Sequence, residues 1–227
     1  MELKSILKNG TSITSSGTTG AAKQIYQSPD KIKYANQAAR DVQKITSTSK
    51  IYTVCKLDHA GGLLAQTLPA IEIDAEVHIE QFNPFRWVTN IKHFTHSHLT
   101  PGMCLAISKT KGWNNLDLEG KIIACGSDRV PAESINRFVA KGATFIANWG
   151  MSEVGPMAIN KTYTPQDAVA YDLPGYTIMG DTAFCDIQIS EWNELMVKGD
   201  ICVYDDWFAT GDIIKFEKGS YWYYGRK

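Results

Sequence analysis

The amino-acid sequence has almost no excess charge of either sign, no closely spaced cysteine pair and no long apolar run. Its 23 basic and 24 acidic side chains leave a formal net charge of −1, so no basic field favours nucleic acid or an anionic membrane. The five cysteines are scattered without a CxxC pair, which is typical of reduced, buried thiols. No apolar run approaches a membrane span, and residues 1–10 are too polar for a signal peptide. We therefore expect a cytoplasmic protein with no nucleic-acid or membrane partner.

The chain contains enough apolar sequence to bury a core. Its 227 residues, 44% of them hydrophobic, suit one large domain or a domain with a small companion. The first two thirds alternate short apolar runs with helix-like stretches, which predicts parallel β–α–β units. The expected strands are 51–54, 75–79, 103–107, 121–124 and 143–149, and the expected helices are 30–45, 60–70, 84–93 and 131–141.

The pattern changes after about residue 165. Short strand-like runs follow one another with turn residues between them and no helix-length segment. These runs are 184–190, 194–199, 200–206, 212–219 and 221–225. We therefore predict an α/β fold: a mostly parallel sheet with flanking helices over residues 1–164, followed by a small antiparallel β subdomain over residues 165–227.

The segment ITSSGTTGAAK, residues 13–23, places two glycines and the hydroxyls of Ser15, Ser16, Thr18 and Thr19 ahead of a lysine. Hydroxyls, bare backbone amides and one cation suit a polyphosphate. The segment is not a Walker A loop, because Gly17 and Gly20 are followed by Ala-Ala-Lys, and the chain has no G-x-G-x-x-G fingerprint. On composition alone, a loop without a ligand is the stronger interpretation, because Gly/Ser/Thr clusters are usually loops.

The order S-S-G-T-T-G-x-x-K resembles the phosphate loop of the adenylate-forming superfamily, which comprises acyl- and aryl-CoA synthetases, luciferases and peptide-synthetase adenylation domains. Further segments resemble this family's other motifs in the same order. They are LDHAGGL (57–63), ACGSDRVP (124–131), NWGMSEVGP (148–156), WFATGD (207–212) and YYGRK (223–227). Ser127 replaces the second glycine of the family's G-G turn, while Trp149 and Ser152 replace a tyrosine and a threonine. The resemblance covers nearly the entire chain.

The resemblance implies ATP, AMP and Mg²⁺ as cofactors and a small carboxylic acid as substrate. The acid would attack the α-phosphorus of ATP, giving an acyl adenylate and pyrophosphate. Lys23, Ser152 and Glu153 would be catalytic, with Glu153 as the magnesium ligand. The implied nucleotide-binding residues are Ser15, Ser16, Gly17, Thr18, Thr19, Gly20, Lys23, Ser127, Asn148, Trp149, Gly150, Ser152, Asp212 and Arg226. The implied acid pocket contains His59, Gly61, Gly126 and Trp149.

Each implied role has a plainer alternative. Glu153 can be a surface turn residue, and Trp149 can be a core aromatic side chain. Asp212 can be the aspartate of a hairpin turn, because Thr-Gly-Asp is a common turn composition. His59 can be an ordinary loop histidine, and Arg226 can be frayed near the end of the chain.

Family members are much longer than this chain, so the resemblance implies a truncated core. It would lack an N-terminal segment and the C-terminal domain that carries a catalytic lysine. We therefore expect weak or partner-dependent adenylation, with CoA used only when a partner domain is present. A homo-oligomer, or a partner chain that supplies the missing domain, would cover apolar surface left bare. The alternative is a non-catalytic nucleotide- or acyl-binding module derived from the same family.

HFTHSH (93–98) holds three of the five histidines and raises the question of zinc. The stretch lacks a nearby cysteine or carboxylate to complete a ligand set. We therefore expect solvated histidines before Pro101.

Overall fold

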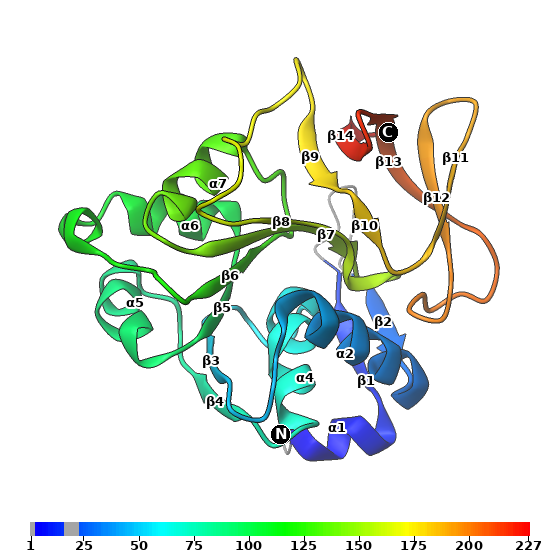
Figure 1. The fold of residues 1–227 in the computed structure, drawn as a ribbon. Helices are drawn as coiled ribbons and strands as arrows, with labels where there is room; N and C mark the ends of the chain where they lie inside the picture. The colour runs from blue at the N-terminus through cyan, green and yellow to red at the C-terminus, as the bar shows by residue number, and fades with distance from the viewer. Residues whose placement is uncertain (1–2, 16–22) are drawn as a thin grey trace.

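The structure is a computed structural model that describes residues 3–15 and 23–227. Its central sheet has seven strands in the order β10-β8-β7-β6-β5-β3-β4 (Figure 1). Neighbours among β3 to β7 run parallel, whereas β8 and β10 are antiparallel to their neighbours. The strands are β3 (Lys50–Thr53), β4 (Glu76–Ile79), β5 (His96–Leu99), β6 (Ile122–Cys125), β7 (Thr144–Met151), β8 (Gly155–Tyr163) and β10 (Thr182–Ala183).

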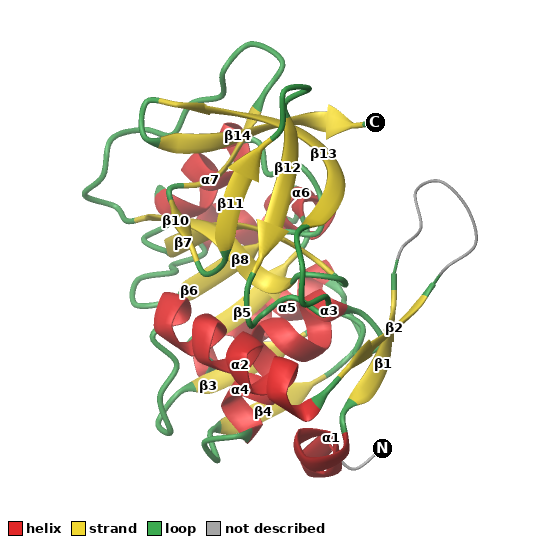
Figure 2. Cartoon of the chain, turned by 90° about the vertical axis from the view of Figure 1, so that its right-hand side faces the viewer, coloured by secondary structure: helices red, strands yellow, loops and turns green. Residues whose placement is uncertain are grey.

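Helices cover both faces of this sheet (Figures 1 and 2). Alternate residues of a strand point to opposite faces, so Ile123 and Cys125 join one apolar core and Ala124 joins another. The first core includes α5 (Pro84–Asn90), η2 (Ile91–His93), α6 (Pro101–Ser108) and α7 (Ala132–Val139), with η3 (Lys111–Asn115) at its margin. The opposite face is covered by α2 (Pro29–Gln43) and by the continuous helical segment α3 (Ala60–Gly62), η1 (Leu63–Thr67) and α4 (Leu68–Ile71).

The predicted parallel β–α–β organisation is confirmed, with one wrong element. The run 103–107 lies in helix α6 and is not a strand. The missed signal is local: Thr100 caps the helix by accepting a hydrogen bond from the Met103 amide, and Pro101 occupies the first turn. The strand of this unit is the preceding segment, β5.

Helix α7 begins where the sequence predicts, but its cap comes from elsewhere. The N-cap residue Pro131 has no side chain that can accept a hydrogen bond, and the Asp172 carboxylate accepts the Ala132 amide at 3.0 Å. A side chain 40 residues away supplies this bond, so local sequence could not reveal it.

A second sheet follows, with five antiparallel strands in the order β11-β12-β13-β14-β9. Its buried residues pack against α2 and β8. Run 200–206 is not a strand, because it turns at Gly199 and the Val203 amide bonds to the Glu153 carbonyl at 2.9 Å. The strands are β9 (Thr177–Gly180), β11 (Asp186–Ile189), β12 (Glu194–Lys198), β13 (Phe208–Glu217) and β14 (Ser220–Arg226).

The predicted fold class, a mostly parallel α/β sheet followed by a small antiparallel β region, is confirmed. The boundary near residue 165 stays a prediction, since β10 lies beyond it yet pairs with β8 of the central sheet. The N-terminal part adds α1 (Leu3–Asn9) and a hairpin of β1 (Thr11–Thr14) and β2 (Gln24–Gln27), which projects to one side in Figure 2. Within the described ranges, every helix is too short or too polar to cross a membrane.

Candidate functional site

The carboxyl ends of β3, β5, β6 and β7 meet at one edge of the central sheet, because these strands are parallel. Ligands of open α/β sheets bind at this edge. The segments singled out in the sequence follow these strands: 57–63 comes after β3, 126–127 after β6, and 152–154 after β7. The topology therefore gathers them on one side of the molecule.

Two glycines allow these segments to approach closely. A Cβ atom on Gly61 would lie 3.0 Å from His98 Cε1 and 3.1 Å from Ser127 Oγ. A Cβ atom on Gly126 would lie only 2.5 Å from Asn148 Oδ1. Gly61, Gly126, Ser127 and Asn148, all predicted site residues, are thus neighbours.

Ser127 adopts a backbone conformation that favours glycine. Its φ angle is 72°, in the left-handed region that costs a residue with a Cβ atom about 1–2 kcal/mol. The resemblance places a glycine at this position, and the geometry explains why. Serine adds a hydroxyl here, close to Gly61.

His98 is a site residue that the sequence interpretation missed. It was expected to be solvated, but both His96 and His98 are 3% exposed within β5. His98 Nε2 lies 3.5 Å from Asn148 Nδ2, and its Nδ1 lies 3.7 Å from Cys55 Sγ. Burial lowers the pKa of His98 to about 4, so the ring is neutral near pH 7. Placing His98 correctly requires assigning HSHL, instead of the following run, as the strand.

Asp212 forms the second part of the site. Its Oδ2 accepts the Trp149 indole N–H at 2.8 Å, and its Oδ1 pairs with Arg226 Nε at 3.1 Å. Asp212 is only 6% exposed. Burial raises its pKa, against the opposing effects of the Trp149 hydrogen bond and the Arg226 charge. Three predicted nucleotide-binding residues from β7, β13 and β14 are therefore in direct contact.

Glu153 lies in the turn between β7 and β8, beside Ser152. The Gln27 side-chain amide donates to the Ser152 carbonyl at 2.8 Å, which joins this turn to the end of β2. Within residues 3–15 and 23–227, the Glu153 carboxylate makes no hydrogen bond or ion pair, and its charge contributes to the raised pKa of Asp212. Gly150 permits the tight strand pairing here, since a Cβ atom on it would lie 2.5 Å from the Gly155 carbonyl oxygen.

The base of the predicted phosphate loop is fixed at both ends. The Ser15 amide donates to the Lys23 carbonyl at 2.9 Å, and the Lys23 amide donates to Ser15 Oγ at 3.2 Å. His59 Nδ1 donates to the Thr14 carbonyl at 2.9 Å, so its ring lies against this base. Ser16, Gly17, Thr18, Thr19 and Gly20 lie outside the described residues.

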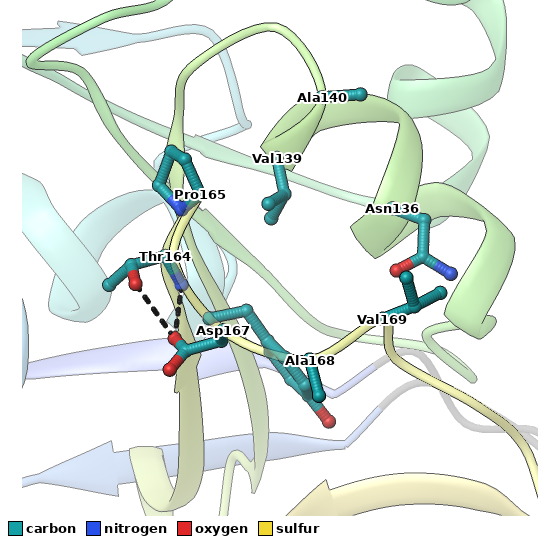
Figure 3. A pocket seen from close by; sticks show the side chains of 9 residues that line it. Asn136, Val139, Ala140, Thr164, Pro165, Asp167, Ala168 and Val169 are labelled. Carbon is teal, nitrogen blue, oxygen red and sulfur yellow. Dashed lines mark hydrogen bonds between the residues drawn. The ribbon is translucent and has the colours of Figure 1, made fainter.

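A cavity of about 290 Å³ lies at the opposite edge of the sheet, where α7 and β8 end (Figure 3). Tyr163 at the end of β8 pairs with Phe145 at the start of β7, far along the strands from the gathered motifs. Asp167 accepts both the amide and the hydroxyl of Thr164. Because this carboxylate is already engaged by its own loop, the cavity offers no convergent polar set for the predicted chemistry.

Comparison with known proteins gives a consistent picture. The family described as "AMP-binding enzyme" matches residues 11–211. Feruloyl-CoA synthases from Amycolatopsis sp. and Streptomyces sp. are each 21% identical over 209 residues, covering 79% of this chain and 41% of their own length. The chain thus spans about two fifths of these curated relatives.

Solved structures share the fold. O-succinylbenzoate coenzyme A synthetase from Bacillus subtilis, in complex with AMP, has a TM-score of 0.77 at 19% identity, over 96% of this chain and 49% of that chain. The inhibitor-bound N-terminal domain of FACL13 from Mycobacterium tuberculosis has a TM-score of 0.77 at 17% identity, over 95% and 60%.

Proposed function

Since the chain belongs to the AMP-binding enzyme family, we propose that it binds ATP, AMP and a small carboxylic acid at the carboxyl edge of its central sheet. In the proposed reaction, the acid's carboxylate attacks the α-phosphorus of ATP, forms an acyl adenylate and releases pyrophosphate. Such displacements depend on positioning and charge neutralisation more than on covalent help from the protein.

Different residues are proposed to bind the phosphates, the ribose, the adenine and the acid. The loop of residues 15–23 holds the β- and γ-phosphates, with Lys23 supplying positive charge to the departing pyrophosphate. Asp212 accepts hydrogen bonds from the ribose hydroxyls, and Trp149 borders the adenine. Gly61, Gly126 and His59 line the approach of the acid, with His98 and Asn148 as neighbouring polar groups.

Glu153 suits the family's magnesium ion. Mg²⁺ prefers oxygen ligands, and it is commonly held by one or two carboxylates together with substrate phosphates and water. The Glu153 carboxylate has no competing hydrogen bond or ion pair among the described residues, so the donor set fits. The bound ion would neutralise phosphate charge, while Glu153 and Ser152 orient the phosphates.

The observation that carries this proposal is the buried Asp212 carboxylate between Trp149 and Arg226. Burial of a carboxylate is costly, and its pKa is raised here. The buried carboxylate therefore adds little to the stability of the folded state, whereas it offers a bound ribose a strong hydrogen-bond acceptor. A charge-assisted hydrogen bond of this kind is worth roughly 1.5–3 kcal/mol.

The test is calorimetric titration of the protein with AMP and with ATP·Mg²⁺. We expect binding of both, and Asp212→Ala should weaken AMP binding on the order of tenfold or more. Asp205→Ala is the matched control, because this carboxylate is fully exposed in the segment before β13. Unchanged AMP affinity in a folded Asp212→Ala protein would remove Asp212 from the site, and no binding of either nucleotide by the wild type would refute the proposal.

Turnover is the finer part of the proposal. Because the matched region is about half the length of the solved relatives, we propose that residues 1–227 activate an acid only weakly, or with the help of a partner domain that also provides for CoA. Acid-dependent pyrophosphate exchange and CoA-ester detection measure the two steps separately. Robust CoA-ester production by the 227-residue protein would contradict weak activity, and nucleotide binding without exchange would identify the alternative, a non-catalytic binding module.

A further inference from the structure

Asp212 owes its position to an irregularity in β13. Where β12 pairs with β13, Met196 lies opposite Ala209 and Glu194 lies opposite Ile213. One residue of β12 therefore faces three residues of β13: Thr210, Gly211 and Asp212. Such a bulge bends the strand and re-aims a side chain, and bulges are frequent beside functional sites.

The bulge is held by contacts that replace regular strand pairing. Thr210 Oγ1 donates to the Leu195 carbonyl at 2.9 Å. Gly211 has a φ angle of 77°, in the region where a residue with a Cβ atom is strained. Its amide cannot follow the ladder, and it donates instead to Glu194 Oε1 at 2.9 Å.

Glu194 connects this amide to the end of β14. Its Oε2 pairs with Lys227 Nζ at 2.6 Å, while the Lys227 amide donates to the Gly211 carbonyl at 2.9 Å. Both backbone polar groups of Gly211 are thus fixed, one by Glu194 and one by Lys227. Glu194 is only 9% exposed, so water is a poor substitute for its carboxylate.

We propose that Glu194 is a positioning residue for nucleotide binding, which holds Gly211 in its left-handed conformation and thereby aims Asp212 at Trp149 and at the ribose. This inference rests on the proposed function. Glu194 does not contact the nucleotide itself. It acts through the backbone of the bulge.

The first measurement is AMP affinity. Glu194→Ala leaves the Gly211 amide without its acceptor, and we expect AMP binding to weaken about tenfold. Glu194→Gln retains an acceptor oxygen and should weaken binding by a smaller factor, about threefold. Glu217→Ala is the matched control, because it removes a carboxylate of the same sheet that is paired with Lys215 at 2.8 Å. It should leave AMP affinity unchanged.

A double-mutant cycle separates positioning from direct contact. If Glu194 acts through Asp212, then adding Glu194→Ala to Asp212→Ala should cause no further loss of AMP affinity. A full additional loss in the double variant would overturn the proposal, because Glu194 would then act independently of Asp212.

The second measurement needs no nucleotide. The Trp149 indole N–H, assigned among the six tryptophans by Trp149→Phe, reports its hydrogen bond to Asp212 in a ¹⁵N-resolved NMR spectrum. Glu194→Ala and Glu194→Gln should shift this resonance, whereas Glu217→Ala should not. An unmoved resonance in a folded Glu194 variant would overturn the inference. If the wild type fails to bind AMP, the proposed function fails, and this resonance alone decides whether Glu194 positions Asp212.

Discussion

Replacing Gly150 by alanine tests whether β7 and β8 pair as closely as the structure shows. A methyl group added at this position would lie 2.5 Å from the Gly155 carbonyl oxygen and 2.8 Å from Pro156 Cα. Both atoms are backbone, so β7 and β8 must separate by several tenths of an ångström. Overpacking of this kind costs about 1–3 kcal/mol, which corresponds to a fall in Tm of about 2–4 °C per kcal/mol for a chain of this size.

Thermal unfolding followed by circular dichroism measures this cost, and titration with ATP·Mg²⁺ measures its effect on the turn that carries Glu153. We expect Gly150→Ala to lower the Tm and to weaken ATP·Mg²⁺ binding. Gly102→Ala is the control for which we expect a rise in Tm. Gly102 lies in α6, and among the described residues outside its own helix backbone only Thr100 Oγ1 lies within 4 Å of its Cβ position, at 3.9 Å. Alanine in a helix is favoured over glycine by up to ~1 kcal/mol. A Gly150→Ala protein as stable as wild type would refute the close strand pairing.

Two further predictions concern protonation and assembly. Because burial depresses the pKa of His98 from 6.5 to about 4, the unfolded chain binds its proton first as pH falls, and stability should drop by about 3 kcal/mol between pH 6.5 and 4. Urea unfolding at several pH values in this range gives the free energy of unfolding as a function of pH. This free energy should depend less on pH for His98→Gln than for wild type or for the exposed control His93→Gln. An identical pH dependence in all three proteins would contradict the lowered pKa of His98. Sedimentation tests the homo-oligomer expected from the resemblance: it should detect a species larger than the monomer, and a strict monomer would count against it.

The sequence was most informative where local patterns decide the structure. The apolar runs 121–124 and 143–149 became β6 and β7, and the predicted helix 131–141 became α7 between them. Gly126 and Asn148, which come from two separate motifs, lie side by side in the structure. They meet because parallel strands must bring their carboxyl ends to one edge.

The failures have two causes: a local helix-start signal was missed in one case, and tertiary contacts overrode local patterns in the other two. The run 103–107 is apolar enough for a strand, but Thr100 and Pro101 start a helix there. The run 200–206 has strand-like residues, yet Val203 bonds to the turn at Glu153. His98 was misjudged because its burial depends on neighbours in β3 and β6 that the local sequence does not display.

The Thr-Gly-Asp segment shows how structure separates two interpretations that composition cannot. A hairpin-turn aspartate would sit at the end of two strands with its carboxylate in water. Asp212 instead lies within β13, on a bulge opposite β12, and is 6% exposed. Its raised pKa means that its charge lowers the stability of the folded state near neutral pH. A regular strand without the bulge would avoid that cost, and the proposed binding of a ribose by Asp212 would account for it.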